Sequence, residues 1–406
     1  MDSLITAAAR ALGAGDPLGA LKRVALREDA PALALRGIAM AQLGDLERAK
    51  ALLKAAGKAF HAREAIARAR CVVAEAEIAL VSRDLSWQPK ALEAARRVLE
   101  AQGDGANAAH AANLAARRLL LIGQVDEAER LLRQLDLRQL PPASVAVHQL
   151  VTAGIAVRRV QSGPARLAFE RSLAAARQAG IPSLLAEIEA DARVLDEPAA
   201  RLIGGGADRP LNLAGVEKVL GSDALVVDAT RNVVRQSGSI VVLATRPVLF
   251  ALLRTLAAAW PGDVSRAQLI AEAFRGKQAD ESHRARLRVE MGRLRSELSG
   301  LAEINATMAG FALAPVEASQ VALLAPPMED PHAGVLALLA DGEAWASSAL
   351  AIALGSSPRT VQRALEQLAA AGKVQSFGRG RALRWITPPM PGFPTALLLP
   401  GPLPGG

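Results

Sequence analysis

The sequence predicts a mainly α-helical protein, in which an N-terminal α-solenoid of helix pairs is followed by two small α+β domains. Residues 1–202 are rich in alanine, leucine and arginine and are interrupted only by short Gly, Asp or Pro turns, which is typical of consecutive helices. Residues 222–315 instead combine short β-branched runs with helical patterns. Residues 331–388 repeat this mixture on a smaller scale.

Length and composition favour several domains in a reducing compartment. The chain has 406 residues, of which about half are apolar, so it can bury more than one core. Its single cysteine, Cys71, excludes an internal disulfide and a cysteine-based zinc site. There is no basic leader before an apolar run, and no apolar stretch approaches the roughly 20 residues that span a bilayer. We therefore expect a cytoplasmic protein with no membrane partner.

The net charge is +8, and the basic excess is spread over both halves of the chain. Net charge reports on solubility and on nonspecific attraction, and it does not identify a fold. A nucleic-acid function must therefore be argued from the local placement of arginine and lysine.

Three segments of the helical region, residues 32–60, 111–136 and 151–180, share one pattern. Each contains a helix, a turn with a glycine, and a second helix with an alanine five positions after that glycine. A small residue at a fixed place lets paired helices approach closely, and stacked pairs bury apolar faces that one pair cannot cover. Residues 79–104 fit a further pair, which gives four or five pairs in all. The glycines and alanines are Gly44, Gly123, Gly163, Ala49, Ala128 and Ala168.

This spacing resembles tetratricopeptide repeats, with Gly37 and Ala49 at two of the family's small positions. The resemblance covers residues 1–202 and implies a surface that binds a protein or peptide partner, or that mediates self-association. A single irregular helical bundle is the alternative interpretation of the same region.

Glycine-rich and proline-rich segments divide the rest of the chain. Residues 203–221 contain three consecutive glycines at 204–206 and have neither a helical nor a strand period, so we expect a linker there. Residues 316–330 are expected to form a second linker. Residues 389–406 form a Pro/Gly-rich tail, to which we assign no site.

The first α+β domain, residues 222–315, is predicted to contain a small sheet, three helices and a hairpin. Its β-branched runs at 225–227, 232–235 and 240–243 predict short antiparallel strands. Pro247 stands where the first helix would begin, and Ser265 is suited to cap the second. A third helix over 280–298 and a hairpin over 304–313 complete the order. The third helix has a stripe of apolar residues that we expect to be buried: Leu287, Met291, Leu294 and Leu298.

This order resembles the OmpR/PhoB-type winged-helix domain of bacterial regulators, most closely in "RPVLFALLRTLA", "VSRAQLIAEAF" and "VEMGRLRSEL". The resemblance implies that the third helix enters the major groove of DNA. Arginine suits this role because its planar fork binds guanine or phosphate through two hydrogen bonds. The alternative interpretation is that this domain is retained for packing or dimerisation and does not bind DNA, so that its arginines are simply exposed to solvent. The candidate DNA-binding residues are Arg284, Arg286, Arg288, Val289, Arg293 and Arg295.

The second α+β domain, residues 331–388, is predicted to contain a helix-turn-helix and a hairpin. Helices are expected over 332–340 and 347–354, and Gly355 then leads to Ser357 as N-cap and Pro358 as first helical residue. In the next helix the spacing of Val361, Leu365 and Leu368 turns these residues to the core and the polar residues away from it. A hairpin follows, with its turn at 378–380.

This run resembles the winged helix-turn-helix domains of MarR, DeoR and GntR-type regulators, in "SPRTVQRALEQLAAAGKV" and in the glycine-arginine wing. Residues 356–385 contain six basic residues and one acidic residue. A winged helix that docks a protein is the alternative. The candidate DNA-binding residues are Ser357, Arg359, Thr360, Gln362, Arg363, Lys373, Arg379, Arg381 and Arg384.

No catalytic set emerges, because the five histidines are scattered and no phosphate-binding, dinucleotide or nucleophile motif is present. We expect no enzyme, no cofactor and no metal. The leading hypothesis is a sequence-specific transcription regulator that binds double-stranded DNA and is controlled through a partner on the repeats. RNA polymerase and a second copy of the chain are further candidate partners. The rival hypothesis is a non-catalytic adaptor in which repeats and winged helices all dock proteins.

Overall fold

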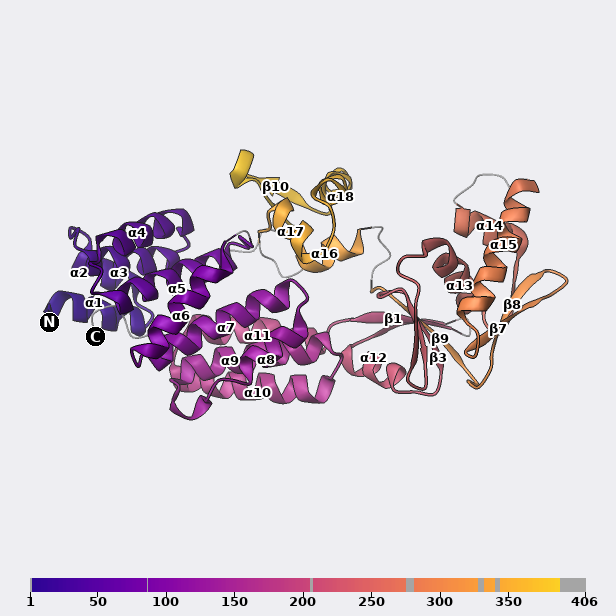
Figure 1. The fold of residues 1–406 in the computed structure, drawn as a ribbon, viewed down its shortest axis with the longest axis horizontal. Coiled ribbons are helices and arrows are strands. Elements are labelled where there is room, and N and C mark those ends of the chain that lie inside the picture. Colours follow the sequence, from indigo (N-terminus) through magenta and orange to yellow (C-terminus); the bar gives the residue numbers. More distant parts are fainter. Residues whose placement is uncertain are drawn as a thin grey trace. The chain divides into compact units, whose positions relative to one another are not determined.

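The computed structural model describes residues 2–85, 87–204, 207–274, 281–327, 332–339 and 344–387 (Figure 1). The protein is mainly helical with a few small sheets, as the sequence predicts. It divides into two compact units. The first combines the N-terminal helices with the described residues after 331, and the second contains the described part of residues 194–331 together with residues 160–162.

The N-terminal region is built from helices that pack in sequence order. From α1 to α9 each helix contacts the next, and the odd-numbered helices also contact one another in series. None of the described helices is both long enough and apolar enough to cross a membrane. The helices are α1 (Ser3–Gly13), α2 (Pro17–Val24), α3 (Ala30–Gln42), α4 (Leu46–Ala59), α5 (Ala65–Val81), α6 (Pro89–Ala101), α7 (Gly105–Leu121), α8 (Val125–Leu132), α9 (Pro142–Arg158), α10 (Ser162–Ala179) and α11 (Pro182–Ala192).

The small residues singled out in the sequence lie where helices approach closely. A Cβ atom on Gly37 of α3 would stand 2.8 Å from Cγ of Leu53 in α4, so a larger residue would separate the pair. Ala49 is completely buried on the same helix as Leu53. Ala128 and Ala168 are also buried, which confirms that these positions are internal.

The turn glycines follow the prediction in two of three cases. Gly44 and Gly123 have positive φ angles of 86° and 79°, which suits a residue without a Cβ atom. Gly163 was expected in the third turn, but it lies inside α10, and Val160 takes the left-handed conformation with φ of 57°. This conformation is strained for a β-branched residue. The partly buried Val160 side chain packs against a hydrophobic cluster of the second unit.

The second unit contains a six-stranded sheet in the order β2-β1-β9-β3-β4-β5. Strands β3, β4 and β5 pair antiparallel and confirm the sheet predicted from the β-branched runs. Strand β9 lies parallel to β3 and antiparallel to β1. The strands are β1 (Ala200–Gly204), β2 (Ala207–Leu211), β3 (Leu225–Asp228), β4 (Val233–Gln236), β5 (Ser239–Val242) and β9 (Val321–Ala325).

The two expected linkers contain folded elements, which corrects the prediction for 203–221 and 316–330. The first contains most of the β1–β2 hairpin, braced by an ion pair of 2.7 Å between Arg201 and Asp208, and helix α12 (Leu213–Leu220). The second contains β9, in which every residue is buried. Leu323 packs into the main core of the unit and Leu324 into a second cluster. An all-apolar strand covered on both faces shows no alternation, so its sequence period did not reveal it.

Three helices and a small sheet complete the second unit. Helices α13 (Pro247–Ala259) and α14 (Arg266–Phe274) begin where the sequence predicts, and α15 (Glu281–Glu297) lies within the predicted third helix. The Oγ atom of Ser265 accepts a hydrogen bond from the amide of Gln268 at 3.2 Å, which confirms the predicted N-cap. The predicted apolar stripe of α15, from Leu287 to Leu298, is buried. The small sheet has the order β6-β8-β7, with β6 (Asp263–Ser265), β7 (Ala302–Ala306) and β8 (Gly310–Pro315).

The C-terminal region belongs to the first unit and has its own core. Val361, Leu365 and Leu368 are buried as predicted, together with Trp345 and Trp385, whose backbones form an antiparallel bridge. Leu85, from the turn after α5, is buried in the same cluster. The proposed tail, 389–406, lies outside the described residues. The elements are α16 (Ala333–Leu339), α17 (Ser347–Ala353), α18 (Pro358–Ala370), β10 (Gln375–Phe377), η3 (Gly380–Ala382) and β11 (Arg384–Ile386).

One buried histidine makes the helical region sensitive to acid. His148 of α9 is 8% exposed, and its Nδ1 atom has no hydrogen-bond partner among the described residues. Burial lowers the pKa of His148 below its usual value of about 6.5. The unfolded chain therefore binds this proton at a higher pH than the folded chain does. The neutral His148 therefore contributes to the free energy of unfolding. This contribution is complete above about pH 6.5 and is lost as the pH falls toward the pKa of His148 in the folded chain.

We expect the His148→Gln variant to lose less stability than the wild type between pH 7 and pH 5.5. The slope of the free energy of unfolding against pH should differ between this variant and the wild type by at most about 1.4 kcal/mol per pH unit, which is the limit for one proton. Urea titrations at a series of pH values would measure this difference. His61→Gln, at an exposed position, is the control and should retain the wild-type slope. Equal slopes for His148→Gln and wild type would contradict the expectation.

Candidate nucleic-acid interface

Helix α18 begins with a capped turn that exposes polar side chains. The Oγ atom of Ser357 accepts a hydrogen bond from the amide of Thr360 at 3.1 Å and lies 2.8 Å from the Thr360 hydroxyl. Pro358 follows the cap as the first helical residue. The two predicted site hydroxyls are thus brought together, and they fix the start of the helix while remaining exposed.

Two arginines of α18 are available for an external partner. Arg359 and Arg363 are four residues apart on the helix and are exposed. Neither side chain has a hydrogen bond or an ion pair within the described residues. Gln362 is half-buried, and its Nε2 atom donates to Oε1 of Glu366 at 3.0 Å. Within the described residues the helix therefore presents two guanidinium groups without an acidic partner and one amide that already has a partner.

A hairpin follows α18 and carries further basic residues. Strand β10 pairs antiparallel with β11, and Arg379 lies exposed in the connecting turn. Gly378 adopts a positive φ of 81°, and a Cβ atom there would clash with the carbonyl oxygen of Ala382, so the turn requires glycine. Lys373 is exposed, and Arg384 is half-buried with its Nη1 atom donating to the Leu383 carbonyl at 3.1 Å. The side chain of Arg381 lies outside the described part of the chain.

Helix α18 and the hairpin are held by one hydrophobic core. Val361 and Leu365 from the helix pack in the same cluster as Val374 and Trp385 from the hairpin. The exposed arginines of both elements therefore project from a single packed unit. Guanidinium groups with no acid to neutralise them can bind phosphate oxygens or the acceptor atoms of guanine.

The arginines of α15 in the second unit are exposed, but most of them contact other residues of the unit. Arg293 forms an ion pair of 3.0 Å with Glu290, and Arg284 lies 3.5 Å from a carboxylate oxygen of Glu281. Arg295 donates from Nε to the Ile304 carbonyl at 2.9 Å. These contacts reduce the number of groups that α15 offers to an external ligand.

Two guanidinium groups of α15 also lie over aromatic rings. The guanidinium carbon of Arg286 is 4.5 Å from the ring centroid of Phe274, and that of Arg295 is 5.8 Å from the ring centroid of Phe311. Arg288 is exposed without a described ion pair or hydrogen bond, and Val289 is 54% exposed. Arg288 and Val289 thus differ from the four other candidate residues of α15, which contact other residues of the unit.

The hairpin after α15 adds no positive charge. Its sequence from Ala302 to Pro315 contains no lysine or arginine. At its turn the Thr307 hydroxyl donates to the Asp263 carboxylate at 2.6 Å, and Met308 is fully exposed. The hairpin of the C-terminal region and this hairpin therefore differ in the charge they present.

Comparison with known proteins adds no family to these observations, since no family model, curated protein or solved structure matches the chain.

Proposed function

We propose that the protein is a sequence-specific transcription regulator that binds double-stranded DNA through the winged helix-turn-helix predicted at residues 331–388. The observation that carries this proposal is the set of exposed guanidinium groups on α18 and its hairpin, namely Arg359, Arg363 and Arg379, without a described acidic partner. We assign the protein no catalytic activity and no cofactor.

The chemistry of α18 suits a recognition helix. Its two exposed arginines lie in the first two turns, and the positive end of the helix dipole adds to their attraction for phosphate. Arginine can read guanine in the major groove through two hydrogen bonds, while contacts to phosphate set the register. Arg379 on the hairpin would then bind the backbone beside the groove.

The other regions take supporting roles in this proposal. The N-terminal helices form a tetratricopeptide-like solenoid that binds a regulatory protein or peptide, or a second copy of the chain. The second unit forms an OmpR/PhoB-type winged helix in which Arg288 and Val289 are the residues left available on α15. RNA polymerase is a further partner that this arrangement could recruit.

A protein-protein adaptor is the second candidate function. Several large apolar side chains of the second unit are exposed, including Ile240 and Val242 on the edge strand β5 and Met308 at the hairpin turn. Exposed apolar groups of this kind are common at protein interfaces. In this alternative the winged helices dock proteins and no DNA sequence is preferred.

A binding titration separates the two functions. We expect the full-length protein to select a DNA fragment from a genomic library and to bind it more tightly than a scrambled competitor. With the single phosphate contact assigned to Arg379, raising the salt from 50 to 200 mM should weaken the affinity by at least about 3-fold. Fluorescence anisotropy at both salt concentrations would measure this change. Equal affinity for every fragment and its scrambled control would favour the adaptor.

A further inference from the structure

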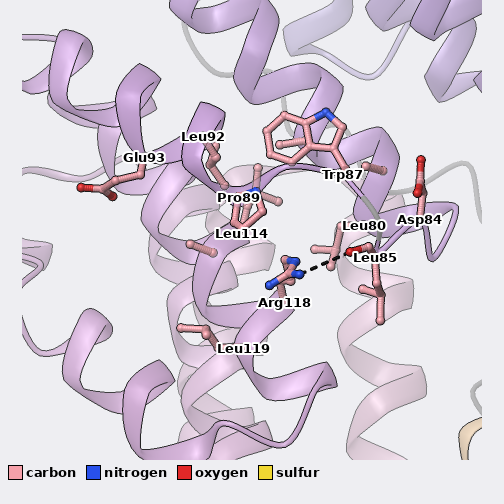
Figure 2. A pocket seen from close by; sticks show the side chains of 13 residues that line it. Leu80, Asp84, Leu85, Trp87, Pro89, Leu92, Glu93, Leu114, Arg118 and Leu119 are labelled. Carbon is pink, nitrogen blue, oxygen red and sulfur yellow. Dashed lines mark hydrogen bonds between the residues drawn. The ribbon is translucent and has the colours of Figure 1, made fainter. Parts of the chain in front are cut away.

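Helices α5, α6 and α7 line a partly open cavity of about 180 Å³ (Figure 2). Its wall is mainly apolar and includes Leu80, Leu92 and Leu114, with Trp87 from the turn before α6 and Pro89 from the first position of that helix. For comparison of size, an enclosed apolar cavity of roughly 150 Å³ holds benzene. The space in the helical region is therefore large enough for a small organic molecule.

One charged side chain interrupts this apolar wall. Arg118 of α7 extends between the leucines, and its Nη2 atom donates to the Leu85 carbonyl at 3.3 Å (Figure 2). Its Nε atom is buried and has no hydrogen-bond partner among the described residues. Burial lowers the pKa of Arg118 relative to its ordinary value. A guanidinium group so placed is costly unless something supplies the missing acceptor.

The acidic residues in the cavity wall do not supply the missing acceptor for Arg118. Asp84 forms an ion pair of 3.1 Å with Lys50 of α4. Glu93 pairs with Arg96 at 2.9 Å and with Arg97 at 3.1 Å, and it lies apart from the Arg118 guanidinium (Figure 2). In the described part of the chain Arg118 has no carboxylate partner. The cavity thus combines an apolar wall with one guanidinium group whose Nε–H has no partner among the described residues.

We propose that this cavity binds a small monocarboxylic acid with an apolar body, of the size of benzoate or phenylacetate. The carboxylate would accept hydrogen bonds from the Arg118 guanidinium, including its unpartnered Nε–H, while the ring would pack on Leu80, Leu92 and Leu114. A neutral molecule of equal shape would lack the charge-assisted bonds. The site lies in the helical region and goes beyond the proposed DNA binding, on which it does not depend.

Calorimetric titration of the full-length protein without DNA would test the site, with benzoate and phenylacetate as probes and their neutral amides as matched analogues. We expect the acids to bind at least 10-fold more tightly than the amides. Arg118→Gln should weaken acid binding at least 10-fold, and Arg118→Lys should restore part of it. Arg130→Gln is the control, since Arg130 of α8 has a side chain 68% exposed and does not line the cavity.

A second variant keeps the test decisive if Arg118→Gln fails to fold. Ala115→Leu fills the cavity without removing a charge, and it should weaken binding of the acids at least 10-fold. The proposal is overturned if no acid binds the wild type at millimolar concentration, if amides bind as tightly as acids, or if Ala115→Leu binds the acids like the wild type. None of these outcomes bears on DNA affinity. If the cavity binds no acid, the proposed DNA-binding function is still tested separately by the DNA titration.

Discussion

Replacing Arg359 and Arg363 together by alanine is expected to weaken sequence-specific DNA binding at least 30-fold while the protein stays folded. A bidentate contact between arginine and a base contributes about 1–3 kcal/mol of discrimination, so two such contacts are worth about 2–6 kcal/mol. Both side chains are exposed and have no described internal partner. Their removal therefore leaves no buried group unsatisfied, and the loss should appear in DNA affinity and not in the melting temperature.

Two double variants make this result specific. Arg130→Ala with Arg133→Ala removes the same charge from exposed side chains at the end of α8, and it should leave the ratio of specific to scrambled binding unchanged. Arg288→Ala with Arg293→Ala asks whether α15 reads DNA. We expect the smaller loss there, because Arg293 is paired with Glu290. An unchanged ratio for Arg359→Ala with Arg363→Ala would exclude α18 as the reading helix.

Truncating Leu323 to alanine is expected to destabilise the second unit by about 2–5 kcal/mol, which is a large part of the stability of an ordinary domain. Leu323 is 1% exposed in β9 and packs with residues of α13 and α15 in the main core. The cavity left behind cannot be filled by movement of one loop, because β9 is paired on both sides.

Hydrogen exchange of the full-length chain would measure this effect on the amides of β3 and β4. Leu323→Ala should speed their exchange, while Val316→Ala should change the local free energy of opening by less than about 0.5 kcal/mol. Val316 lies in the same expected linker and is 54% exposed. If the two variants exchange alike, β9 does not contribute to the core as the structure indicates.

The elements that could be predicted from the sequence carry local signals. The cap at Ser357, the proline after it and the spacing of Val361 and Leu365 together define α18, and none of them depends on a distant residue. Strands β1 and β9 lacked such signals. Their partners lie far along the chain, and an apolar run such as that of β9 fits a buried strand or a piece of helix equally well.

In the candidate site, too, some features follow from local sequence spacing and others depend on residues that are distant in the sequence. Periodicity alone indicates that Arg359 and Arg363 face solvent. The pairing of Arg293 with Glu290 could also have been foreseen from their spacing of three residues on a helix. The contact of Arg286 with Phe274 could not, since the ring comes from another helix. The cavity beside Arg118 could not be predicted from the sequence either, because its wall is assembled from separate helices and no sequence motif marks it.

The parallel pairing of β3 with β9 also constrains the order of events during synthesis. Leu225 pairs with Val321, so β3 leaves the ribosome long before its neighbour in the sheet exists. Until β9 arrives, β1 and β3 each have an unpaired edge, and such edges can associate with other chains. The N-terminal helices pack on their sequence neighbours and can assemble as they emerge. Slow translation or early termination before residue 321 would therefore harm the second unit selectively and leave the helices before it able to fold.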